Sequence, residues 1–258
     1  MKQLLILFLL FLSLYAKEPT VELGIGMGTL YYPNYIGSKN YQTLTLPFPH
    51  IRYRGECFRI DEDGLSGKLF GINGLRLDLS ISGSLPADSK NDNARDGMPD
   101  LDLTGEVGFQ LVYELYKNEP MILEFELPLR AVLSTDFTNL VYRGVISNPQ
   151  LKLSLNYSEF EWTFRSGIMI ADKDYNSYYY GVSNEYVTQN RKLYHAKGGF
   201  SGFRNRVGLT YQKDSWWGGA FFSHYSIENA VFKNSPLVET TQTSYVGVSI
   251  AYIFYTKD

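Results

Sequence analysis

Apolar and polar residues alternate with a period of two along most of this chain. In the stretch 121-MILEFELPLRAVL-133, every second residue from Leu123 to Leu133 is apolar, and Glu124, Glu126, Pro128 and Arg130 lie among them. The same alternation recurs at 75–85, 103–116, 150–157, 160–168 and 246–254. A period of two is typical of a strand with one apolar and one polar face. Since we find no helical stripe after Ala16, the pattern predicts an all-β protein.

Two β architectures produce this alternation: a soluble sandwich or barrel with an apolar interior, and a membrane barrel with its apolar face outward. The alternating runs are longer than the five or six residues usual in soluble strands, and near the ~9–11 that cross a bilayer at a tilt. Aromatic residues gather at the predicted strand ends, for example at Tyr31–Tyr32, Trp216–Trp217 and 252–255. Such aromatic residues form the girdles of membrane proteins at the lipid–water interface. We therefore predict an antiparallel transmembrane β-barrel.

The first residues predict export. An apolar run from Leu4 to Leu12 follows Met1-Lys2-Gln3 and precedes the small residue Ala16. This pattern is typical of a cleaved signal peptide at residues 1–16, which leaves 17–258 as a single barrel domain. The alternative is a membrane-anchor helix, but the run is too short to span a bilayer. No cysteine follows it closely, which argues against a lipoprotein. The predicted location is the outer membrane of a Gram-negative bacterium.

Loop lengths predict the topology. Short connections are expected at 54–56, 117–120, 157–159 and 213–215. Long connections are expected at 32–43, 86–102, 134–147, 172–195 and 227–242. Because outer-membrane barrels have short periplasmic turns and longer extracellular loops, this alternation predicts about ten strands with both termini in the periplasm. Two further short strands within 57–74 would make twelve.

The alternation also assigns the two faces of each strand. Leu123, Phe125, Leu127 and Leu129 should face lipid. The charged residues that should face the lumen are Glu22, Arg76, Asp78, Glu106, Glu124, Glu126, Arg130, Lys152, Glu161, Arg165, Arg204 and Arg206. A narrow lumen favours paired charges, because an isolated buried charge is costly. We therefore expect a salt-bridged plug rather than an open pore. Pro128 cannot donate to a ladder, so a β-bulge is expected there.

Composition excludes several classes of protein. The formal net charge is −3 and 20% of the residues are charged, so no basic face for nucleic acid is predicted. Cys57 is the only cysteine, which excludes an intramolecular disulfide and a cysteine-based zinc site. A mean hydropathy of −0.20 argues against a helical membrane protein. No cofactor is predicted.

One loop is rich in carboxylates. The segment 91-NDNARDGMPDLD-102 contains the motif Arg95, Asp96, Gly97, Met98, Pro99, Asp100 and Asp102. Clustered carboxylates suit calcium, but the spacing does not match a known calcium loop, so no metal is predicted. The favoured interpretation is a solvated loop over the barrel mouth, in which Arg95 pairs with an Asp. Gly97 and Pro99 indicate a fixed turn.

Two other groups of residues are candidates for chemistry. His224 and Ser226 share one face of a strand, and Glu228 could orient the histidine, as in barrel enzymes that deacylate lipids. The favoured alternative is that His224 is a girdle residue beside Phe222 and Tyr225. Positive charge at Arg191-Lys192, with Lys197, Arg204 and Arg206, could contact lipopolysaccharide phosphates. A solvated rim explains the same charges.

Four ordered pieces of the chain resemble the MipA/OmpV family of outer-membrane proteins. These pieces are 26-GMGTLYYPNYIGSKNYQTLTLPFPHIRYRGECF-58, 95-RDGMPDLDLTGEVG-108, 178-YYYGVSNEYVTQNRKLYHAKGG-199 and 235-SPLVE-239. The resemblance implies an outer-membrane barrel. It also implies a scaffold that brings a murein lytic transglycosylase together with a penicillin-binding protein, although no docking residues can be assigned.

The leading hypothesis is therefore a non-catalytic structural or scaffolding barrel of the cell envelope, surrounded by outer-membrane lipids and lipopolysaccharide. A narrow passive channel for small solutes is the second hypothesis, and a lipid-deacylating enzyme is the third.

Overall fold

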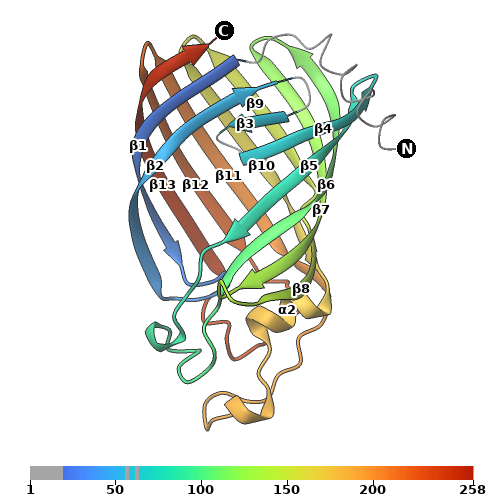
Figure 1. Cartoon of the computed structure of the whole chain (residues 1–258). Helices are drawn as coiled ribbons and strands as arrows, with labels where there is room; N and C mark the ends of the chain where they lie inside the picture. Colours follow the sequence, from blue (N-terminus) through green and yellow to red (C-terminus); the bar gives the residue numbers. More distant parts are fainter. Residues whose placement is uncertain (1–19, 56–57, 62–63, 258) are drawn as a thin grey trace, which may run out of the picture.

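The computed structural model describes residues 20–55, 58–61 and 64–257, and the predicted signal peptide lies outside them. Within these ranges one antiparallel sheet closes on itself as a barrel, because β11 pairs with β10 as well as with β12 (Figure 1). The strands are β1 (Thr20–Pro33), β2 (Tyr41–Arg54), β3 (Phe58–Asp61), β4 (Gly64–Ile72), β5 (Leu75–Ser84), β6 (Leu103–Asn118), β7 (Met121–Thr135), β8 (Leu140–Ser147), β9 (Gln150–Tyr157), β10 (Phe160–Ala171), β11 (Gly199–Lys213), β12 (Trp216–Ser226) and β13 (Gln242–Lys257). The predicted antiparallel barrel is confirmed.

These thirteen described strands occupy twelve positions around the barrel. β8 and β9 both lie between β7 and β10, so they act as one long strand that is interrupted at Asn148 and Pro149. The additional positions relative to the predicted ten are β3 and β4, which come from the 57–74 segment. The alternative of twelve strands is therefore the one found.

The two ends of the barrel differ in their connections. One end carries tight turns, such as Asn73–Gly74, where both residues have positive φ (47° and 81°) and so match the right-handed twist of a hairpin. β1 begins and β13 ends at this same end, since Val21 pairs with Lys257. The opposite end carries the long loops, together with the helices η1 (Ser89–Asn91), α2 (Lys173–Tyr180) and η2 (Asn184–Tyr186) (Figure 1).

The long loop expected at 134–147 is wrong. β7 continues to Thr135 and β8 begins at Leu140, so only residues 136–139 connect them. The Asp136 carboxylate accepts hydrogen bonds from the backbone N–H groups of Thr138 (2.9 Å) and Asn139 (2.7 Å). These bonds hold the pKa of Asp136 well below its usual range. A self-capped Asp turn needs few residues, which explains the tight connection.

The helix α2 was also not predicted. Asp172 caps its N-terminus by accepting a hydrogen bond from the N–H of Tyr175 at 2.9 Å. Its inward face is formed by tyrosines, including Tyr179 one turn beyond Tyr175. An eight-residue helix with a tyrosine stripe has little apolar contrast, so its periodicity is hidden. None of the helices in the described ranges is long and apolar enough to cross a bilayer.

Strand β7 shows how the alternation produces two faces. Glu124 and Glu126 are only 7% and 5% exposed and lie inside the barrel, whereas Leu129 is 59% exposed. Phe109, which pairs with Leu129 from β6, is 57% exposed on the same outer face. An exposed apolar face around a closed sheet with a polar interior is the arrangement of a membrane barrel.

The bulge expected at Pro128 is wrong. Pro128 pairs in regular register with Gln110 of β6. The interruption lies instead on its other neighbour, where β8 ends at Ser147 and β9 begins at Gln150. Pro128 has no N–H to donate, and the break at Asn148–Pro149 removes the partner that would have needed it. The Ser147 hydroxyl donates to the Pro128 carbonyl oxygen at 2.6 Å.

Strand β3 is much shorter than its neighbours, with four residues against 14 in β2 and nine in β4. In the described ranges, β2 pairs with β3 only through Tyr53 and Arg54, so residues 41–52 of β2 have a strand partner on the β1 side alone (Figure 1). Pro47 and Pro49 lie in this part of β2. Proline is tolerated in a sheet where its missing N–H faces an unpaired edge. The two prolines therefore match the short hairpin beside them.

Candidate functional site

The long loops close one end of the barrel with an aromatic cluster, which we call the loop plug. Its buried members are Tyr35, Ala87, Leu101, Met169, Tyr179, Tyr180, Ala196, Tyr225, Ile227, Ala230 and Phe232. At its centre, the rings of Tyr180 and Phe232 stack with 3.7 Å between centroids. Burial raises the pKa of Tyr180 well above its ordinary value and that of Tyr178 to about 12. The plug therefore keeps these phenols neutral to a higher pH than a free tyrosine, whose pKa is about 10.

Asp92 links two loops within the plug. It is 1% exposed, and its carboxylate accepts hydrogen bonds from Asn34 Nδ2 (3.0 Å) and Ser38 Oγ (2.6 Å). It also accepts from the backbone N–H of Arg95 at 3.2 Å. Asn34 and Ser38 belong to the β1–β2 loop, and nearby Tyr35 donates to the Leu237 carbonyl in the β12–β13 loop at 2.7 Å.

The predicted loop motif at 95–102 lies at this mouth and is partly buried. Gly97 has φ +75° in a turn closed by the Met98 N–H and the Arg95 carbonyl at 2.8 Å, so the expected fixed turn is present. Asp100 accepts from the Ser89 N–H at 2.7 Å, and Asp102 pairs with Arg143 at 3.5 Å. The motif is thus a set of loop-fixing contacts.

Two expectations for the basic residues of the loops are wrong. Arg95 does not pair with an Asp in the described part of the chain; it donates to the carbonyls of Tyr179 (3.2 Å) and Pro99 (3.1 Å). Arg191 is not a rim charge, because it is buried and donates to the Ala94 and Asp96 carbonyls at 2.9 Å each. Arginine is well suited to bridging several loop carbonyls, since its guanidinium carries five donors.

The remaining residues of the predicted basic patch also lie apart from one another. Arg204 and Arg206 line the barrel interior, so they do not form one patch with Lys192 and Lys197. Among residues 20–55, 58–61 and 64–257, no group of three or more His, Cys, Asp or Glu side chains is placed to hold a metal ion.

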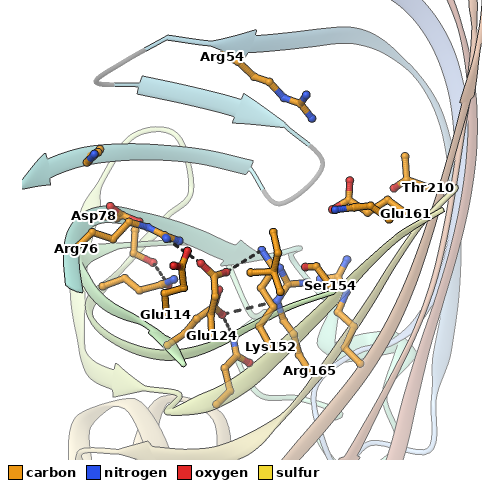
Figure 2. Close-up of a pocket in the computed structure, with 18 of the residues that line it drawn as sticks. Arg54, Arg76, Asp78, Glu114, Glu124, Lys152, Ser154, Glu161, Arg165 and Thr210 are labelled. Carbon is orange, nitrogen blue, oxygen red and sulfur yellow. Dashed lines mark hydrogen bonds and ion pairs between the residues drawn. The ribbon is translucent and has the colours of Figure 1, made fainter. Parts of the chain in front are cut away.

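Beyond the loop plug, the barrel encloses a cavity of about 970 Å³, which we call the vestibule (Figure 2). Its lining includes Arg54, Lys117 and Glu159, which lie at the end of the barrel that carries the short turns. The vestibule is therefore open toward the short turns and closed toward the long loops.

Ion pairs follow the wall of the vestibule. Arg76 contacts Asp78 at 2.7 Å and Glu124 at 2.8 Å, and Lys152 lies 3.9 Å from the same Glu124 (Figure 2). Arg165 lies 3.8 Å from Glu126. These contacts bring together residues from β5, β7, β9 and β10.

A further ion pair joins Arg130 to Glu106 at 3.0 Å. Arg130 also donates to Asn148 Oδ1 at 2.9 Å. Paired charges therefore do not fill the lumen as expected. They line its wall and leave the vestibule, while loops close the far end.

Glu22 anchors a third group that the sequence did not predict fully. It lies 3.5 Å from Arg52 and 3.8 Å from His50, and Gln212 donates to it at 3.1 Å. His50, Arg52 and Arg54 are spaced two apart in 49-PHIRYR-54 opposite Ile51 and Tyr53, so the same alternation could have identified them.

The remaining predicted lumen residues lie on β10 and β11. Glu161 lines the vestibule (Figure 2). The guanidinium carbon of Arg204 lies 5.6 Å from the centroid of the Tyr225 ring, and that of Arg206 lies 4.2 Å from the centroid of Phe221. Both arginines thus stack on aromatic rings of β12.

The structure does not assemble the possible His224–Ser226 pair. The His224 ring nitrogens contact Ser244 Oγ (3.1 Å) and Gln242 Oε1 (2.9 Å), and Ser226 Oγ instead accepts from Gln242 Nε2 at 3.0 Å. A nucleophile and its base must lie within hydrogen-bond reach of each other. Here Gln242 lies between them.

The chain is similar to several known proteins. The family model for MltA-interacting protein MipA matches residues 25–254. The outer membrane protein Omp26La of Vibrio anguillarum is 28% identical over 225 residues, which cover 84% of this chain and 79% of that protein. The outer membrane protein OmpV of Vibrio cholerae is 28% identical over 211 residues, covering 78% and 76%. Among solved structures, a bacterial polysaccharide outer membrane secretin covers 90% of this chain and 98% of its own, at 9% identity and a TM-score of 0.43.

Proposed function

The chain belongs to the MipA family of outer-membrane proteins, and from that premise we propose that it is a non-conducting barrel that anchors envelope proteins at the periplasmic face. One observation carries this proposal: the loop plug closes the barrel at the long-loop end, while the vestibule opens toward the short turns. Short turns face the periplasm in outer-membrane barrels. The accessible interior and turns of the protein are therefore presented to periplasmic partners.

The family description suggests the class of partner. The description MltA-interacting protein names a murein lytic transglycosylase as a partner of that family. We include a penicillin-binding protein in the proposal because the sequence resemblance implies one. We propose that this chain docks such an enzyme through its turn end, where Lys117 and Glu159 are exposed or half-buried beside the vestibule. We further propose that it has no catalytic activity of its own, in keeping with the separated His224 and Ser226.

Site-specific photocrosslinking would test the docking. A photoreactive residue at position 117, near the end of β6, or at position 158, in the β9–β10 turn, should crosslink to a lytic transglycosylase or a penicillin-binding protein in intact envelopes. The matched control is position 139, which lies in the tight β7–β8 turn at the opposite end and is exposed. Crosslinks to these enzymes from position 139 but not from 117 or 158 would contradict the proposed orientation. If none of these positions crosslinks to either class of enzyme, the scaffold proposal is contradicted.

The second candidate is a narrow channel, which is favoured by the size and polarity of the vestibule. The two proposals differ in the state of the plug. A closed barrel should give little or no steady conductance in planar bilayers. A large, stable wild-type conductance would instead support the channel.

A further inference from the structure

The ladders of the barrel wall are interrupted between β2 and β5. On the β2 side, residues 41–52 have a described strand neighbour only in β1. On the β5 side, β4 pairs only as far as Ser80, so residues 81–84 have a described strand neighbour only in β6. The β3–β4 hairpin fills this part of the wall at the short-turn end (Figure 1). At the long-loop end, the contacts of Asp92 with the β1–β2 loop join the two sides.

Side chains on the inner face of β5 become exposed where the ladder with β4 ends. Ser80 and Ser82 both line the vestibule, so both lie on the inner face. Ser80 is only 7% exposed, whereas Ser82 is exposed, and so is Ser84, the next residue on that face. The interior is therefore accessible from the side of the barrel. We call the opening between residues 41–52 of β2 and 81–84 of β5 the lateral window.

Strand β2 turns apolar residues inward beside the lateral window. Its register with β1 is unbroken, so Leu46 and Phe48 lie on the same face as Arg52, which lines the vestibule. Leu46 is nonetheless 52% exposed. The outer face at this height carries Thr45 and Pro47. The facing of β2 is therefore the reverse of that of β7, whose leucines point outward.

The inner surface beside Leu46 is apolar and has room for a ligand. Gly28 of β1 is the direct partner of Leu46, and a Cβ at Gly28 would lie 3.5 Å or more from its nearest non-neighbouring atoms. Phe48 packs edge-on against Trp217 of β12, with 6.4 Å between ring centroids. Trp217 is in turn buried against Ile253 and its neighbours on β13. The interior therefore has an apolar side, formed by β1, β2, β12 and β13, that borders the lateral window.

Hydrocarbon lies outside the lateral window. Ile25 and Met27 are the direct partners of Pro49 and Pro47, and they are 63% and 49% exposed on the outer face. This height therefore belongs to the lipid-facing band. Unpaired backbone groups are costly in lipid, and the two prolines lower that cost because they have no N–H. They also disfavour an added protein strand, whose ladder would need those donors. A lipid chain needs none.

We propose that the lateral window admits one acyl chain of a membrane phospholipid, which lies inside the barrel against Leu46 and Phe48. Removing this apolar surface from water stabilises the bound chain. A phospholipid has two chains on a small headgroup, so one chain can turn inward while the other stays in the bilayer. This lipid site is separate from the docking of a periplasmic enzyme and does not depend on it.

Tryptophan quenching in the full-length protein would test this proposal. The chain has three tryptophans, so the double variant Trp162→Phe, Trp216→Phe leaves Trp217 as the only one. In vesicles of phospholipid brominated along its chains, Trp217 should lose fluorescence, because bromine quenches tryptophan only at close range. The same protein in vesicles of unbrominated phospholipid gives the reference intensity.

Two charge variants in this background separate a chain inside the barrel from lipid outside it. Leu46→Asp should restore the fluorescence, because a carboxylate against hydrocarbon is costly. Ser154→Asp is the matched control, since it places the same charge on β9, on the polar side of the interior, and quenching should persist. Heat modifiability checks that each variant is folded. Unquenched Trp217 in brominated vesicles would overturn the proposal, as would quenching that Leu46→Asp retains.

Photocrosslinking in intact envelopes identifies the occupant of the lateral window. A photoreactive residue at position 46 should form adducts with phospholipid although it faces inward. Position 248 is the positive control, because Val248 is 54% exposed on the outer face of β13 and should crosslink to lipid in any case. Lipid adducts at 248 but not at 46 would overturn the proposal. Adducts at 46 with lipid A alone would overturn it in favour of lipopolysaccharide, and adducts with a second copy of this chain in favour of an added strand.

Discussion

Asp92 shows how one side chain can hold the loop plug together. It is buried and accepts hydrogen bonds from Asn34, Ser38 and the backbone of Arg95, so it joins two loops that are distant in sequence. A buried acceptor with this many donors is costly to remove, because each donor left unsatisfied costs about 1–3 kcal/mol.

We therefore expect Asp92→Ala to loosen the plug. The Asn34 amide and the Ser38 hydroxyl would lose their buried partner, which should lower the unfolding temperature and allow intermittent conductance in planar bilayers. Asp96→Ala is the matched control, because Asp96 lies in the same loop with an exposed side chain. Equal behaviour of the two variants would show that Asp92 does not hold the mouth closed.

At the scale of single residues, the sequence predicted which side chains lie inside but not all of their contacts. Glu124, Glu126 and Arg130 were assigned to one face by alternation alone, and in the structure all three are buried in the barrel. The partners of Arg95 and Arg191 could not be predicted, because they are carbonyls of other loops. Every residue has a backbone carbonyl, so a sequence pattern cannot show which carbonyls accept these hydrogen bonds.

Strand β7 is the element in which the two faces differ most clearly. Leu127 lies in its middle on the outer face, between the inward-facing Glu126 and Pro128. Charge on the lipid face is most costly near the middle of the membrane. The element can therefore be tested by changing a single outward residue.

We expect Leu127→Arg to impair assembly, since arginine at the midplane of the lipid face costs roughly 2–4 kcal/mol. The yield of heat-modifiable protein in outer-membrane fractions measures this effect. Leu127→Val keeps the site apolar and should assemble like the wild type. Normal assembly of Leu127→Arg would mean that this face of β7 does not meet lipid.

Elements were predicted from sequence where alternation was long and uninterrupted. The prediction was wrong where a local feature, such as a turn or a proline, determined where a strand ends or is interrupted. Asp136 closes a four-residue turn, and Pro128 is accommodated by a break in the neighbouring strand. The β3–β4 hairpin was only an alternative, because β3 has four residues and the nine residues of β4 do not alternate regularly between apolar and polar.

For the whole molecule, the contrast between the two ends is the main feature. The plug is apolar and aromatic, whereas the vestibule is polar and charged. A pH change that charges the plug without charging the vestibule should therefore open one end selectively. The tyrosines of α2 provide such a change.

We expect the plug to loosen between about pH 10 and pH 12. Burial, with Tyr179 and Asp102 nearby, raises the pKa of Tyr178 from 10.0 to about 12, although Arg143 over its ring at 4.3 Å opposes this. Tyr178 binds its phenolic proton more tightly in the folded plug than it does when the plug is released. The stabilisation is therefore complete below pH 10 and is lost as the pH rises through the folded pKa.

Conductance and tyrosinate absorbance, recorded together across this range, would follow the opening, while circular dichroism reports whether the barrel remains. Tyr178→Phe cannot ionise, so its conductance should depend less on pH in this window. A plug that stays closed up to pH 12 would show that the neutral phenols do not hold it.

The short β3–β4 hairpin has a mechanical consequence for the whole cylinder. β2 is joined to β1 by a ladder along its whole length, but residues 41–52 of β2 have a described strand neighbour only on the β1 side. Pro47 and Pro49 have no N–H to donate, so this edge of β2 cannot form a continuous ladder with another strand. Lateral stress from the surrounding bilayer would therefore concentrate at this seam. The barrel would widen or narrow at this edge of β2, and the ladders between the other strands would stay intact.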